Sequence, residues 1–313
     1  MPRHRPARPL LLLAAAIFAG ASPAHAQIAF GSVGVEADDE SGYIVFGALG
    51  GDVASSTTWD IAVSHADAST DFYDLSTTAY DGSIYHDFGS MGLRVGFGGW
   101  SDEEIVAVDQ ISAALDVHGE TWSIALLTRL SDSDFEPLQI NRTITRRDGS
   151  QVTIDGSADC QVDDLGLGAR ARVSHGEWTF SIDGMTFDYE DFACDFDLAV
   201  LDVLRRATRD EFVQLADRVT DALSLGSARH LLTRTTFLDS RYSLSLRRDT
   251  AVRTYGLYLD HAEDAFLGRV ADTLRGSIGF VLRSGHEIEI YLGATDVDNG
   301  TVAFLGLSLL LLR

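Results

Sequence analysis

Side chains along most of this chain alternate between apolar and polar with a period of two residues. Between residues 120 and 131, Trp122, Ile124, Leu126 and Leu130 fall on one face, and smaller or polar residues fall on the other. A period of two indicates β-strands with one apolar face and one solvated face. The alternating segments run for about 9 to 12 residues, the length that a tilted strand needs to cross a bilayer.

About fourteen such segments can be placed, and twelve to sixteen are compatible with the pattern. The expected strands are residues 28–36, 43–50, 57–66, 73–85, 90–100, 105–117, 120–131, 163–173, 178–188, 241–248, 252–261, 273–283, 287–295 and 301–312. The predicted fold is all-β: a closed antiparallel transmembrane β-barrel. An even number of strands places both chain ends on the same side of the membrane.

The connections between these segments also form a pattern. Tight turns such as His118-Gly119-Glu120, His175-Gly176-Glu177 and Gly285-His286-Glu287 alternate along the chain with acidic connections that we expect to be longer. Two of the latter are Asp132 to Glu136 and Asp296 to Gly300. Short turns at one end and longer loops at the other are typical of barrels in the outer membrane, with the short turns in the periplasm.

Two segments do not fit as spanning strands. Residues 138–156 read as an extra hairpin around the turn residues Asp148 and Gly149, polar enough to stand in water. Residues 195–226 read as a helical insertion, because Phe212, Leu215 and Val219 recur at helical spacing. Both insertions are expected on the side opposite the short turns.

The first 26 residues form a predicted signal peptide. Three arginines precede an apolar run, and Ala24-His25-Ala26 supplies a cleavage site, so residues 27–313 form the predicted mature barrel. With these features and the closing strand from Thr301 to Leu312, the chain resembles Gram-negative, porin-like outer-membrane β-barrel proteins. The resemblance is to an architecture, although such chains usually end in an aromatic residue and this one ends in Arg313. It implies export to the outer membrane, with the lipid of that membrane as a partner.

The two cysteines, Cys160 and Cys194, lie at similar distances on either side of the turn at Gly176. In a hairpin they would emerge at the same rim, and an oxidising compartment favours a disulfide between them. Two free thiols are the alternative.

The expected inward faces of the strands carry charges of both signs. The candidate pore-lining residues are Arg94, Arg129, Arg170, Arg172, Asp183, Arg247, Asp260, Arg275, Glu287 and Glu289. One interpretation is a wet pore, passive or gated by loops, whose charges select small solutes. The other is a plugged interior held by ion pairs, in a structural or surface-interaction barrel without transport.

Other classes of function fit the sequence less well. A net charge of −23 argues against a nucleic-acid partner, because phosphates attract a basic surface. The histidines and serines form no Gly-x-Ser-x-Gly elbow or other catalytic set, so we expect no enzyme and no cofactor. Acidic pairs such as Asp132 and Asp134 match no complete calcium loop, so we expect no metal site. A secreted β-sandwich would bury the apolar face that a barrel shows to lipid.

Overall fold

The computed structural model describes residues 27–39, 42–69, 74–102, 106–145, 151–189, 193–196, 238–265, 270–297 and 300–312. The predicted signal peptide, residues 1–26, and nearly all of the predicted helical insertion, residues 195–226, lie outside these described residues. Within the described part of the chain every regular element is a strand, so the helical insertion has no support there. No helix among the described residues is long and apolar enough to cross a membrane.

The described residues form fifteen strands. They are β1 (Gln27–Asp38), β2 (Tyr43–Ala54), β3 (Thr57–Ser69), β4 (Asp74–Asp87), β5 (Met91–Asp102), β6 (Val106–His118), β7 (Trp122–Thr145), β8 (Gln151–His175), β9 (Trp178–Tyr189), β10 (Ala193–Phe196), β11 (Leu238–Asp249), β12 (Arg253–Asp264), β13 (Val270–Val281), β14 (Glu287–Val297) and β15 (Gly300–Leu312).

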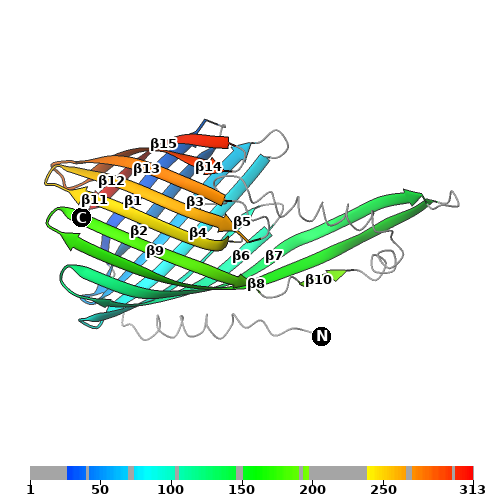
Figure 1. The fold of residues 1–313 in the computed structure, drawn as a ribbon, viewed down its shortest axis with the longest axis horizontal. Helices are drawn as coiled ribbons and strands as arrows, with labels where there is room; N and C mark the ends of the chain where they lie inside the picture. Colours follow the sequence, from blue (N-terminus) through cyan, green and yellow to red (C-terminus); the bar gives the residue numbers. More distant parts are fainter. Residues whose placement is uncertain are drawn as a thin grey trace.

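All strands but the short β10 form one closed antiparallel ring (Figure 1). Neighbours in sequence pair with each other, and β15 pairs with β1 from Phe30 opposite Leu312 to Asp38 opposite Phe304. β9 pairs with β8 on one edge and with β11 on the other, so the ring continues from β8 through β9 to β11 without β10. Closure leaves the ring without free strand edges, as lipid requires. The predicted closed antiparallel barrel of fourteen strands is therefore confirmed.

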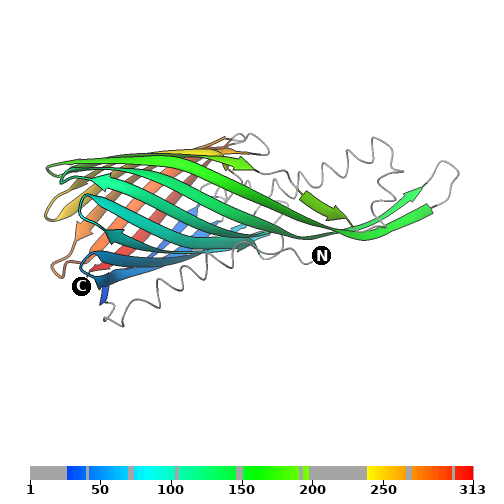
Figure 2. The same cartoon turned by 90° about the horizontal axis from the view of Figure 1, so that it is seen from below.

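β7 and β8 are about twice as long as the other strands, with 24 and 25 residues. Beyond the ring they remain paired up to Thr145 opposite Gln151, after a register shift between Phe135 and Leu138. Figure 2 shows this paired ribbon projecting well past the other strands. Residues 138–156, predicted as an extra hairpin, thus lie largely in the continuation of two barrel strands. The short β10 pairs with β8 at the base of the ribbon.

The outward face of the ring is apolar. On β7, Trp122, Ile124, Leu126 and Leu130 are all exposed, and the side chain of Leu126 reaches an exposed fraction of 66%. Similar outward rows lie on the other strands, whereas most of the buried apolar residues lie near the strand ends remote from the tight turns. Exposed apolar surface of this extent is unfavourable in water and is stabilised by contact with lipid. The chain is therefore an outer-membrane type of β-barrel.

The two ends of the barrel differ. One end, here the turn end, holds the turns at 55–56, 88–90, 119–121, 176–177, 250–252 and 282–286, together with Gln27 and Leu312. Gly89, Gly176 and Gly285 in these turns adopt positive φ angles of 104°, 58° and 86°, which glycine adopts without the steric cost of a Cβ.

The opposite end, here the loop end, holds the β7–β8 ribbon and the connection from β9 to β11. The prediction of longer acidic connections at this end is wrong at two positions. Asp132 to Glu136 lie within β7, and Asp296 lies within β14, where it is opposite Thr301. Strand pairing extends through Asp132, Asp134 and Asp296, whose exposed side chains reach solvent beyond the apolar band.

Candidate functional site

The inner wall of the barrel carries charged side chains of both signs. Leu93 and Val95 are exposed on the outward face of β5, so Arg94 between them points into the lumen. The same alternation places the other nine predicted pore-lining residues on the inward face of their strands. Their role in lining a pore remains a prediction.

Arg94 joins three strands on one side of the lumen. Its Nη1 lies 2.8 Å from Oδ1 of Asp60 on β3 and 2.6 Å from Oγ of Ser83 on β4. The Ser83 hydroxyl in turn donates to Asp60 at 2.8 Å. The side chains of Arg94 and Asp60 keep exposed fractions of 45% and 33%. Water therefore reaches this pair inside the ring, and its net stabilisation is small because water screens it.

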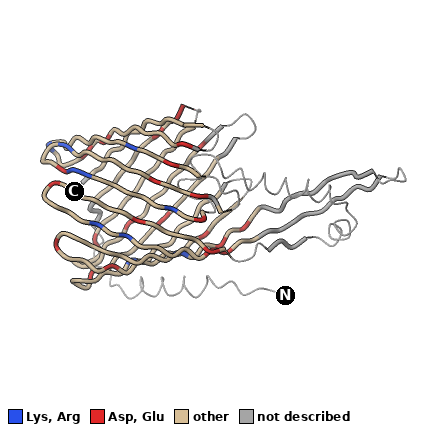
Figure 3. The backbone as a smooth tube through the Cα atoms, in the orientation of Figure 1, with Lys and Arg blue, Asp and Glu red and all other residues tan. Residues whose placement is uncertain are grey.

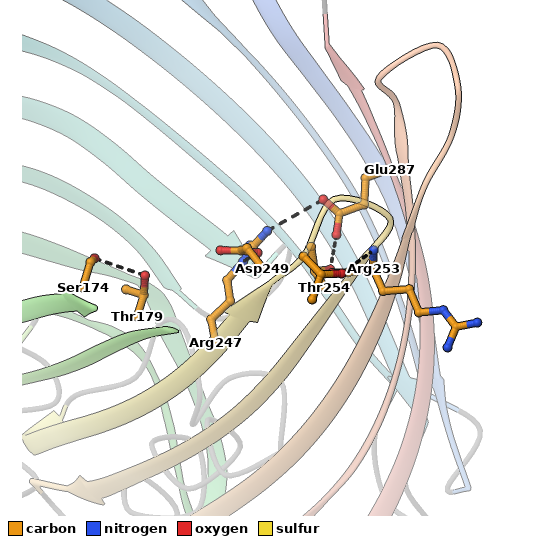
Figure 4. Close-up of polar contacts among 8 residues, drawn as sticks. Ser174, Thr179, Arg247, Asp249, Arg253, Thr254 and Glu287 are labelled. Atoms are coloured by element: carbon orange, nitrogen blue, oxygen red, sulfur yellow. Dashed lines mark hydrogen bonds and ion pairs between the residues drawn. The ribbon is translucent and has the colours of Figure 1, made fainter. Parts of the chain in front are cut away.

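A second group of charges, here the turn-end cluster, consists of Arg247, Asp249, Thr254 and Glu287 (Figure 4). Arg247 Nε donates to Asp249 Oδ1 at 2.6 Å, and its Nη2 lies 3.7 Å from Glu287 Oε2. The Thr254 hydroxyl donates to the other Glu287 oxygen. The cluster connects β11, β12 and β14 across the inner wall, and Arg247 remains 43% exposed.

Two further pairs lie on the wall formed by β8, β9, β11 and β12. Arg170 Nε is 4.0 Å from Asp183 Oδ1, and Asp183 also accepts a hydrogen bond of 2.7 Å from Ser243. Arg241 donates two hydrogen bonds to Asp260, at 3.0 and 2.7 Å.

Arg241 was not among the predicted pore-lining residues. Its alternation with Ser243, Ser245 and Arg247 is the signal that could have found it. Arg172 also faces the lumen and is exposed, and no described carboxylate lies within ion-pair distance of it.

Three predicted residues sit in more enclosed surroundings. Arg129 lies 3.8 Å from the buried Asp164 and 4.2 Å from the centre of the Phe187 ring, so it belongs to a packed part of the wall. Arg275 lies between two tyrosine rings, 4.2 Å from that of Tyr258 and 5.1 Å from that of Tyr291. Glu289 accepts a hydrogen bond of 3.4 Å from the hydroxyl of Ser308.

Charge is distributed unevenly around the described inner wall. β1 to β4 bring Glu36, Asp52, Asp60 and Asp81 to the inward face and bring no arginine. Every described lumen arginine comes from β5, β7, β8, β11 or β13. In the ring of fourteen strands β8 lies half-way round from β1, and β11 lies half-way round from β3. The arginines of β8 and β11 therefore face the acidic strands β1 and β3 across the lumen.

The two cysteines lie on paired strands at the loop end. The register of β10 against β8 places Cys194 directly opposite Cys160. Directly opposite residues of an antiparallel pair have α-carbons about 4.5 to 5.5 Å apart, which lies within the range that a disulfide spans. The disulfide itself remains a prediction.

Within the described ranges, no group of three or more His, Cys, Asp or Glu side chains is arranged to hold a metal ion.

Comparisons with known proteins find resemblance in structure only. No family model matches the chain, and neither does any curated protein sequence. Among solved structures, OccK5 (OpdH) of Pseudomonas aeruginosa aligns over 91% of this chain and 97% of its own, with 7% identity and a TM-score of 0.39. The KdgM porin aligns over 89% of this chain and 97% of its own, with 10% identity and a TM-score of 0.37. OmpT of Vibrio cholerae aligns over 92% and 98%, with 8% identity and a TM-score of 0.39. The resemblance is one of barrel architecture.

Proposed function

We propose that this barrel is a channel for small solutes across the outer membrane. The observation that carries the proposal is the water-accessible charge on the inner wall. Arg94, Arg170 and Arg247 have side-chain exposed fractions of 45%, 53% and 43% although all three point into a closed ring. A plugged interior would bury such groups, and burial of a charge without full pairing is costly.

The uneven distribution of charge gives this channel a field across its lumen. Solutes pass between the acidic strands β1 to β4 and the arginines of β8 and β11, so polar molecules orient as they cross. The net charge of −23 and the inward acids of β1 to β4, strands that bring no arginine of their own, favour cations over anions. Screening by salt weakens this preference, because the Debye length falls from about 10 Å at 0.1 M to about 3 Å at 1 M.

The test is single-channel recording from the folded barrel in a planar bilayer. We expect discrete conductance steps and, in a potassium chloride gradient, a reversal potential of the sign for cation preference that shrinks as salt rises. Anion preference would contradict the role given to the acids.

One observation favours a second candidate, a closed barrel that acts through its surface. At the loop end Phe187, Leu238 and Ala262 form a buried apolar cluster on the inner wall, beside the packed Arg129. If this packing extends across the lumen, correctly folded protein will give no conductance in the same recording. Absence of conductance from the folded barrel would therefore contradict the channel and favour the closed barrel.

A further inference from the structure

Two arginines depart from the inward pattern of the others. Arg248 follows Arg247 on β11, and Arg253 precedes Thr254 on β12. Because Arg247 and Thr254 both contact Glu287 inside the lumen, their neighbours point to the outer face. Figure 4 shows Arg253 extending away from the turn-end cluster. Every other strand arginine with a described side chain faces the lumen, so these two are the cations that the strands present to lipid.

Both arginines lie against aromatic rings at the turn end. The guanidinium carbon of Arg248 is 5.5 Å from the centre of the Trp178 ring, and that of Arg253 is 6.0 Å from the Phe280 ring. Arg248 is opposite Tyr255, two residues from Arg253, so the two arginines are diagonal neighbours on adjacent strands. Outward aromatic rings at strand ends mark the depth of the lipid headgroups. The two guanidinium groups therefore lie at headgroup depth.

The two arginines differ in their partners. Arg248 forms an ion pair of 3.0 Å with Glu177, in which both side chains are about half exposed. Arg253 has no carboxylate within ion-pair distance among the described residues, although Figure 3 shows both basic and acidic residues at this end of the barrel. A guanidinium fork binds a phosphate with two parallel hydrogen bonds, a geometry that suits an unpaired arginine.

The opposite end of the outer face carries the opposite charge. Asp67, Asp109 and Asp272 point outward there, and they accept hydrogen bonds from Tyr43, from Tyr80 and, in its protonated or Nδ1–H form, from His261. No described arginine stands among them on that face. An anionic lipid is therefore repelled at the loop end and attracted at the turn end.

We propose that Arg248 and Arg253, with Trp178 and Phe280 beneath them, bind the phosphate headgroup of an anionic phospholipid in the leaflet at the turn end. Arg253 holds the phosphate, and Arg248 shares its charge between the phosphate and Glu177. The rings position the guanidinium groups and contact the upper part of the acyl chains. This site needs an embedded barrel but not an open lumen, so it stands independently of the channel.

The test measures which lipid lies next to Trp178. The full barrel is folded into phosphatidylcholine vesicles that contain an equal small fraction of either brominated phosphatidylglycerol or brominated phosphatidylcholine, since bromine quenches nearby tryptophan. The contribution of Trp178 is the difference from Trp178→Phe in the same background. We expect the anionic lipid to quench Trp178 more strongly, because each arginine at the surface should enrich that lipid next to Trp178 roughly fivefold. This enrichment should fall at high salt.

Variants separate the site from a general effect of charge. Arg253→Gln should remove most of the enrichment, and Arg253→Lys should retain part of it because it keeps the charge but loses the fork. Arg172→Gln, which removes one lumen arginine and the same charge, should change nothing. Equal quenching by the two lipids in the unmodified barrel would overturn the proposal, as would an equal loss in Arg172→Gln and Arg253→Gln. The comparison of lipids in the unmodified barrel and in Trp178→Phe decides the matter even where an arginine variant fails to fold.

Discussion

Replacing neighbouring leucines on β7 by arginine should have very different effects on the stability of the barrel. Leu126 points outward and is 66% exposed at the middle of the apolar band, whereas Leu127 points into the lumen. Both residues are leucines on the same strand, at nearly the same distance from the ends of the ring. They differ only in the solvent that a new charge would meet.

The magnitude follows from that difference. An arginine on the lipid face at the bilayer midplane costs about 2–4 kcal/mol, so Leu126→Arg should lower the folding equilibrium constant roughly 30- to 1000-fold. In Leu127→Arg the guanidinium reaches lumen water beside Arg129 and Arg170, which are both already charged. We expect a cost under about 1 kcal/mol, mainly from repulsion between like charges in a screened environment.

The assay is reversible unfolding of the barrel by guanidinium chloride in lipid vesicles, followed by tryptophan fluorescence. The free energy of unfolding of each variant is compared with that of the unmodified protein, and heat-modified mobility on a gel verifies folding. Equal costs for the two variants, or a larger cost for Leu127→Arg, would refute the assignment of faces. The barrel would then have to be turned inside out or not be embedded in lipid.

Three other predictions use the same protein. Gly176→Ala should lower the free energy of unfolding by about 1 kcal/mol, because Gly176 has a positive φ. Gly276→Ala should lower it little, because Gly276 lies in an ordinary strand and its added Cβ also meets open space. Equal losses in the unfolding assay would contradict this. Asp60→Asn should leave Arg94 without its carboxylate and lower cation preference, measured as reversal potential, while Asp109→Asn on the outer face should not; a shift caused by Asp109→Asn would show that outer charges set selectivity. We propose that Cys160 and Cys194 form a disulfide, so peptide mass mapping without reductant should recover the two peptides linked. The double variant Cys160→Ser and Cys194→Ser should leave barrel stability unchanged but speed proteolysis between residues 197 and 225. Two free thiols in the oxidised protein would contradict the pairing.

Much of the fold could be predicted from the sequence because the physics of a membrane strand is local. A strand that separates lipid from water must alternate residue by residue, so Trp122, Ile124 and Leu126 reveal their shared face without any knowledge of their neighbours. Glycines and charged residues at the tight turns reveal where each strand reverses. The number of strands, and the inward direction of Arg94 or Glu287, follow from these two signals.

The limits of the prediction are equally local in origin. A polar run such as Asp132 to Glu136 has the composition of a loop, because acids stand on the face where apolar residues would mark a membrane strand. In the structure the same strand continues the β7–β8 ladder. Asp132 and Asp134 are exposed on its outward face beyond the apolar band, and Ser133 and Phe135 are buried on its inward face. The composition of a segment shows whether it faces lipid or water, but it does not show whether a solvated segment is a strand or a loop.

The sequence by itself determined which residues face lipid and which face the lumen, because alternation encodes the two solvents. Only the tertiary structure decided which charges meet. Arg94 finds Asp60 two strands away, and Arg247 finds Glu287 three strands away along the ring. Closure of β15 on β1, and of β8 through β9 to β11, sets the tilt and stagger that bring these side chains together. A single strand cannot encode that stagger, because it exists only once the whole ring has closed.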